Sequence, residues 1–62
     1  MKELEYVEIN VETKHETDLA VLFSDEDREF WVPKSQMEDW SEVGKSGIAL
    51  VTEWFAEKEN LI

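Results

Sequence analysis

Cysteine is absent from the 62-residue sequence, which therefore has no disulfide framework and no thiolate metal site. The longest uninterrupted apolar run, residues 19–23, is far too short to cross a bilayer. The first residues lack the apolar core of a signal peptide, and there is no repeat or low-complexity segment. We therefore expect a single soluble domain over residues 1–62, inside the cell and without a membrane partner.

Basic residues are scarce: six Lys and Arg stand against 16 Asp and Glu, which gives a formal net charge of −10. So acidic a surface repels both the phosphate backbone of nucleic acid and anionic lipid, which argues against direct binding to either. The acids are spread along the chain instead of forming a terminal tail. A hydrophobic share of 42%, with three Trp and three Phe, argues against disorder.

The first half of the chain has the patterns of strands. Apolar residues alternate over residues 4–11, with a change of parity between Tyr6 and Val7 that predicts a β-bulge there. Residues 13–18 are polar and predict a turn. The continuous apolar run of residues 19–23 predicts a central strand that is buried on both faces.

The middle of the chain predicts a hairpin followed by an ambiguous segment. Residues 24–28 read as a turn and 30–32 as the return strand, which Pro33 ends or places at a sheet edge. Ser35 and Glu38 have the spacing of a capping box, which favours one helical turn over residues 36–40, and a short strand is the alternative.

The last third combines a loop, a strand and a helix. Residues 43–47 contain both glycines and predict a loop, and residues 48–51 predict a strand. Thr52 is a good N-cap for a helix over residues 53–59, and Asn60 suits the left-handed residue that ends a helix. The apolar face of this helix is predicted at Trp54, Phe55, Leu61 and Ile62.

Several strands followed by one helix indicate an α+β fold. We expect a small, strongly curled antiparallel sheet of four or five strands, SH3-like or OB-like barrel in type, with one C-terminal helix on it. The sequence does not determine the strand order.

Residues 17–23 read Thr-Asp-Leu-Ala-Val-Leu-Phe, and residues 30–37 read Phe-Trp-Val-Pro-Lys-Ser-Gln-Met. These segments resemble a pattern of small phage, prophage and mobile-element proteins, in which an E-T-x-x-A strand precedes W-(I/V)-P-K-S-Q. Residues 53–62 are similar to the segment with which such proteins often close. Leu19 departs from the pattern, which commonly has Lys there, and Asn60 stands where Gly is common. The resemblance implies a setting in the cytoplasm of a bacterial host and implies no catalytic residue.

Catalytic chemistry has little support in the sequence. His15 is the one histidine, and it has carboxylates but no nucleophile beside it. The acids of residues 25–29 lack the glycine and the bidentate Glu of a calcium loop. We therefore predict a binding protein and not an enzyme, with no cofactor, no metal and no catalytic residues.

Trp31 and its neighbours are the best candidates for contact with a partner, because an aromatic ring beside a rigid proline and polar groups can form a recognition surface. A structural interpretation of the same stretch has Trp31 or Phe30 in the core, Pro33 ending a strand and Ser35 capping a turn. Trp40 stands inside an acidic cluster, either at the core edge or as a contact anchor. The full candidate set is Asp25, Glu26, Asp27, Glu29, Trp31, Lys34, Gln36, Glu38, Asp39, Trp40 and Glu42.

The acidity has a plain interpretation, a solvated surface that keeps the protein soluble. A sharper hypothesis is that the carboxylates imitate nucleic-acid phosphates and occupy a basic groove of a host defence protein, in the manner of an anti-CRISPR or anti-restriction inhibitor. A third is an accessory protein-interaction module in phage replication or host takeover, without mimicry. Each of the last two requires a host or phage protein as partner, with a basic surface in the case of mimicry.

Overall fold

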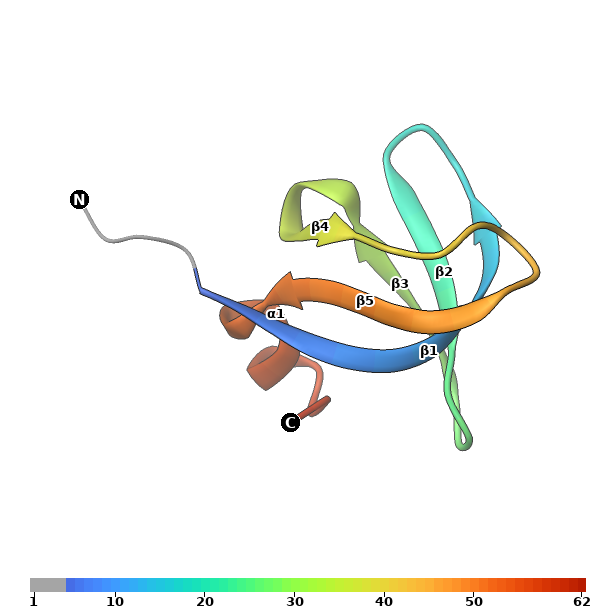
Figure 1. Ribbon diagram of the computed structural model, residues 1–62. Helices are drawn as coiled ribbons and strands as arrows, with labels where there is room; N and C mark the ends of the chain where they lie inside the picture. Colours follow the sequence, from blue (N-terminus) through green and yellow to red (C-terminus); the bar gives the residue numbers. More distant parts are fainter. Residues whose placement is uncertain (1–4) are drawn as a thin grey trace.

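The computed structural model describes residues 5–62, and its central element is the long strand β1 (Tyr6–Glu16). It lies in the middle of a five-stranded antiparallel sheet with the order β3-β2-β1-β5-β4 (Figure 1). The other strands are β2 (Ala20–Ser24), β3 (Glu29–Pro33), β4 (Met37–Asp39) and β5 (Ser46–Thr52). The short 3-10 helix η1 (Lys34–Gln36) joins β3 to β4, and α1 (Glu53–Lys58) follows β5. The α+β class and the C-terminal helix are confirmed.

Strand β1 changes partner at Glu12. Its first part pairs with β5, from Tyr6 opposite Thr52 to Glu12 opposite Ser46, and its last part pairs with β2. The register against β2 shifts between Thr13 and His15, just after β1 stops pairing with β5. A β-bulge bends a strand locally, which suits this change of partner.

The predicted bulge between Tyr6 and Val7 is wrong, because pairing with β5 continues unbroken through both residues. The apparent change of parity arises because Tyr6 lies on the outer face, where it is 37% exposed. Leu4, which began the predicted strand, lies outside the described residues. The predicted turn over residues 13–18 is also wrong in its first part, which belongs to β1. Thr13 pairs with Phe23 there, and both are fully buried.

The inner faces of all five strands share one core with α1. Its buried members are Ile9, Val11, Val21, Phe23, Phe30, Val32, Met37, Ala49, Val51, Phe55 and Ala56. The prediction that residues 19–23 are buried on both faces is wrong: Val21 and Phe23 are fully buried, Ala20 and Leu22 are half-buried, and Leu19, just before β2, is 81% exposed. The sheet has a core on one face only, so every second residue of β2 points away from it.

The predicted barrel is wrong, because the sheet is neither closed nor strongly curled. A barrel needs a ladder between its outer strands. The outer strands here are β3 and β4, which are joined by η1 and do not pair. Strand β4 has three residues, and its register against β5 shifts between Met37 and Asp39, so it offers no length for a closing ladder.

The segment after β3 follows the alternative prediction of a short strand. Pro33 is the N-cap of η1, no side chain caps it, and the predicted capping box of Ser35 and Glu38 does not form. Pro33 is also the last residue of β3 at the sheet edge, as expected for a residue that has no N–H to donate.

Helix α1 begins at Glu53, as the sequence indicates, and ends at Lys58, one residue before the predicted end. The Thr52 hydroxyl accepts a hydrogen bond from the Phe55 amide at 3.2 Å, and Asn60 has a φ of 57°. The Leu61 amide donates to the Ala56 carbonyl at 2.8 Å, which completes a Schellman ending. The predicted buried face is half wrong. Phe55 is buried and Leu61 packs on the core, whereas Trp54 and Ile62 are 60% and 64% exposed and buried Ala56 was not predicted. The helix is only six residues long, which leaves one narrow face for the core.

Candidate protein-binding surface

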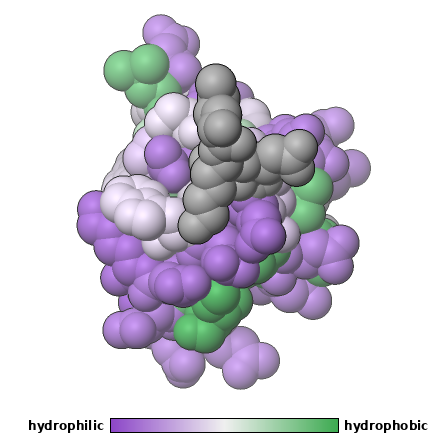
Figure 2. Space-filling view, turned by 90° about the vertical axis from the view of Figure 1, so that its left-hand side faces the viewer, coloured by the Kyte–Doolittle hydropathy of each residue, from purple (hydrophilic) through white to green (hydrophobic). Residues whose placement is uncertain are grey.

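The carboxylates dominate the surface. No Asp or Glu of residues 5–62 is buried, since the buried polar side chains there are threonines. Two ion pairs form among these residues, Lys14 with Glu12 at 3.4 Å and Lys34 with Glu16 at 2.8 Å. Figure 2 shows one face of the molecule, on which hydrophilic residues prevail and hydrophobic residues form separate patches. Most of the negative charge therefore faces solvent without an intramolecular partner.

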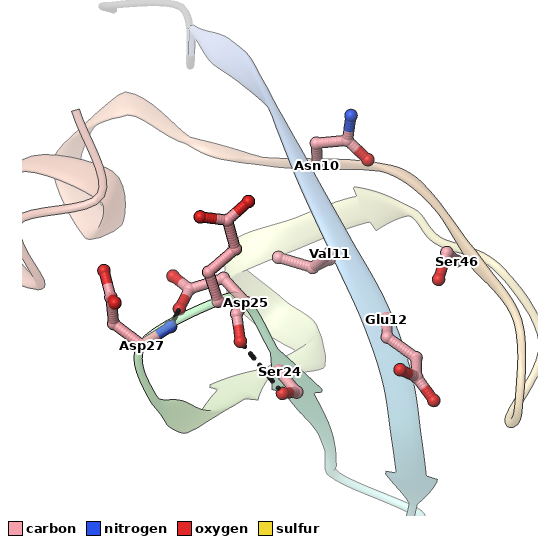
Figure 3. Close-up of a pocket in the computed structure, with 8 residues that line it drawn as sticks. Asn10, Val11, Glu12, Ser24, Asp25, Asp27 and Ser46 are labelled. Carbon is pink, nitrogen blue, oxygen red and sulfur yellow. Dashed lines mark hydrogen bonds between the residues drawn. The ribbon is translucent and has the colours of Figure 1, made fainter.

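One group of acids lines an open hollow of about 610 Å³, which we call the acidic hollow. The hollow lies where β1 changes partner (Figure 3). At Glu12, β1 pairs both with Ser24, the last residue of β2, and with Ser46, the first residue of β5, so the β2–β3 turn lies close to the start of β5. Its acids are Glu12 from β1 and the three consecutive acids of the β2–β3 turn. The complete lining is Asn10, Val11, Glu12, Ser24, Asp25, Glu26, Asp27 and Ser46.

Asp25 organises the turn that carries these acids. Its Oδ1 accepts hydrogen bonds from the amides of Asp27 at 2.9 Å and Arg28 at 3.0 Å. These two donors, Asp27 first, hold the pKa of the Asp25 carboxyl below its ordinary value, because they stabilise the charged form. Arg28 also donates to the Glu59 carbonyl, so the turn is tied to the end of α1. Glu26 and Asp27 are exposed beside this framework.

Lys34 and Trp40 are held by contacts within the protein. Lys34 Nζ lies 2.8 Å from Glu16 Oε2, and Trp40 Nε1 donates to Glu16 Oε1 at 3.2 Å. Hydrogen bonds from Lys34 first, and then from Trp40, lower the pKa of Glu16. Trp40 is half-buried against the core, which agrees with the core-edge interpretation of this residue. These contacts join the end of β1 to η1 and to the loop after β4.

Gln36 also has a structural contact, because its Oε1 accepts a hydrogen bond from the Thr52 hydroxyl at 2.8 Å. Glu38, Asp39 and Glu42 are exposed, on β4 and in the loop that follows it. Strand β4 and strand β3 are opposite edges of the sheet. The structure therefore separates the predicted set into a group at the β2–β3 hairpin and a second group at the β4 edge.

Trp31 lies on the outer face of β3 and is 48% exposed, so of the two core candidates, Trp31 or Phe30, it is Phe30 that is buried. Phe30 and Val32, on either side of it, are the core residues of this strand. Trp31 stands opposite Leu22, which stands opposite His15. The His15 ring meets the Trp31 ring edge-on, with centroids 6.2 Å apart.

Sequence reasoning missed Glu12, Asn10 and Ser46 as neighbours of the acidic turn. The alternation of β1 places Glu12 on the face opposite to Val11, and this could have been predicted from the sequence pattern. What brings these residues to the turn is the change of partner at Glu12, for which the sequence carries no local signal.

No group of three or more His, Cys, Asp or Glu side chains in residues 5–62 is arranged to hold a metal ion. No helix in the same part of the chain is long and apolar enough to cross a membrane. Comparison with known proteins gives no match among family models, curated sequences or solved structures.

Proposed function

We propose that the protein is a non-enzymatic inhibitor that binds the basic surface of a protein partner and thereby excludes nucleic acid from it. The observation that carries this proposal is that no Asp or Glu of residues 5–62 is buried and that Glu12 and the β2–β3 turn form an acidic hollow. A groove that binds nucleic acid is lined by Lys and Arg, which neutralise the phosphates and release the counterions condensed on them. Carboxylates on a compact fold engage the same cations.

The partner in this proposal is a host protein that binds nucleic acid, of the nuclease or restriction type that defends bacteria. The resemblance to phage and mobile-element proteins supports this setting in the bacterial cytoplasm. Electrostatic attraction of this kind accelerates association and weakens steeply as salt is added. The same charge keeps the inhibitor itself away from nucleic acid.

The test is capture of a partner from host lysate, followed by titration of the partner against labelled duplex with and without this protein. We expect competition for the partner, with an affinity that falls steeply with salt, and no binding of the protein to duplex alone. Simultaneous binding of duplex and protein to the partner without loss of either would overturn the proposal.

Paired charge reversals localise the contact. Glu26→Lys with Asp27→Lys changes the acidic hollow and leaves the structural hydrogen bonds of Asp25 in place. Glu38→Lys with Glu42→Lys makes the same change in net charge at the opposite edge of the sheet. We expect the first pair to weaken inhibition more than the second. Equal losses would mean that total charge, and not the hollow, determines affinity.

A second function is supported by Trp31, whose exposed ring is typical of an anchor in a protein interface. In this alternative the protein is an accessory module in phage replication or host takeover, without mimicry. It predicts a partner whose binding is insensitive to duplex and only weakly dependent on salt.

A further inference from the structure

We propose that Trp31 and Glu29 form a receptor site for an arginine side chain of the partner, with Leu22 as the surface for its aliphatic stem. This inference deepens the proposed function and rests on it in one respect, namely that the partner is basic. We call the three residues, with His15 at their edge, the Trp31 platform.

The platform lies on the outer face of the sheet, away from the core that the strands share with α1 in the described part of the chain. Across β1, β2 and β3 the register aligns His15, Leu22 and Trp31 in one row, and Glu12, Ser24 and Glu29 in the next. Rows that face the same side of a sheet are about 6.6 Å apart, two residues along each strand. Glu29 is exposed two positions from Trp31 on the same face, so its carboxylate can reach a cation that lies on the ring.

The fold itself already uses cations in this way on three other rings. Arg28 lies over Phe30 at 5.4 Å, Lys34 over Trp40 at 5.8 Å, and Lys58 over Trp54 at 5.0 Å from the ring centroids. No Lys or Arg of residues 5–62 lies over Trp31. Trp31 is thus an exposed indole beside the Glu29 carboxylate, and neither group binds a Lys or Arg of the described chain. Both are therefore free to attract a cation from a partner.

The charge of the molecule decides the kind of occupant. A second copy of this chain carries the same net charge of −10, and acids repel it as they repel nucleic acid. A basic protein segment complements this charge. Arginine fits better than lysine, because its planar guanidinium stacks on an indole, is less strongly hydrated and makes two parallel hydrogen bonds to one carboxylate.

The test uses two synthetic peptides of equal length and charge, one with Arg alternating with Gly and one with Lys alternating with Gly. Binding to the intact protein is measured by titration calorimetry, and the indole N–H signals of the three Trp residues are followed by NMR. We expect the Arg peptide to bind more tightly, with the largest shift at the Trp31 indole. Trp31→Ala should lower affinity for the Arg peptide about three- to tenfold and remove most of the preference for Arg.

Trp54→Ala is the matched control, because Trp54 is also exposed but lies beneath Lys58 of its own helix. It should leave the Arg preference intact. Equal effects of the two substitutions, or equal affinity of the intact protein for both peptides, would overturn the Trp31 site.

These outcomes separate the site from the proposed function. If both peptides bind in a salt-sensitive way and Trp31→Ala has no effect, the site is wrong while attraction to basic partners stands. If the Trp31 effect appears but a captured partner binds duplex and protein together, the inhibitor function is wrong and the arginine site stands.

Discussion

Thr13 is fully buried, and its hydroxyl has no hydrogen-bond partner among the described residues. Removing an unsatisfied buried hydroxyl without changing the shape of the side chain relieves a desolvation penalty. We expect Thr13→Val to raise the free energy of unfolding by about 1 kcal/mol in chemical denaturation.

Thr52→Val is the control for this prediction, since the Thr52 hydroxyl is equally buried but caps α1 and donates to Gln36. That substitution should lower the free energy of unfolding by about 1–2 kcal/mol. Changes of the same sign at the two threonines would contradict the assignment of the Thr13 hydroxyl as unsatisfied.

The carboxyl of Asp25 makes stability depend on pH. Its pKa is lowered in the folded protein by the amides of Asp27 and Arg28, so its charge stabilises the fold above about pH 4. That contribution is lost as pH falls through the folded-state pKa. The stability difference between wild type and Asp25→Asn should therefore be largest near neutral pH and shrink below about pH 4.

Glu26→Gln removes the same charge from the same turn and serves as the reference for general repulsion. Thermal melts of the three proteins from pH 7 to pH 3 make the comparison. If Asp25→Asn and Glu26→Gln differ from wild type by equal amounts at every pH, the backbone hydrogen bonds of Asp25 contribute nothing specific.

At the scale of elements, α1 contacts the core through one narrow face. Phe55 is 5% exposed and Trp54 is 60% exposed, although they are neighbours in sequence. Phe55→Ala should lower the free energy of unfolding by about 3–5 kcal/mol, because it leaves a cavity under the helix. Trp54→Ala should change it by less than about 1 kcal/mol, the loss of one exposed contact with Lys58. Chemical denaturation of the two variants checks which face of the helix is buried, provided that the slope of the unfolding free energy against denaturant (the m-value) is unchanged.

Most element positions could be predicted because their signals are local. The Thr52 cap, the left-handed Asn60 and the β2–β3 turn each depend on a few adjacent residues. The acids of the turn were predicted for the same reason. Glu12 and Ser46 were not, because their place in the hollow depends on which distant strands pair with β1. The sheet likewise stays open, with β3 and β4 unpaired, because β4 is only three residues long, and the hydrophobic periodicity of the sequence does not reveal that length.

At the scale of the whole molecule, repulsion among carboxylates opposes folding. The net charge is −10, and among residues 5–62 two ion pairs offset it locally. Salt screens this repulsion, with a Debye length of about 10 Å at 0.1 M. The melting temperature should therefore rise between low ionic strength and about 0.1 M NaCl. A decrease over this range would mean that attractive pairs outweigh the repulsion.

The change of partner in β1 has a consequence for the order in which the chain acquires its structure. β2 and β3 follow β1 closely in the chain, so the ladders that join these three strands need only short loop closures and should form first. The first part of β1 pairs with β5, from Tyr6 with Thr52 to Glu12 with Ser46, and this ladder closes a much longer loop, so it should form later. Until β5 pairs, the first part of β1 is an unpaired strand to which another unfolded chain could add. Its acidic outer face, with Glu8 and Glu12, repels like chains and so opposes aggregation through this strand.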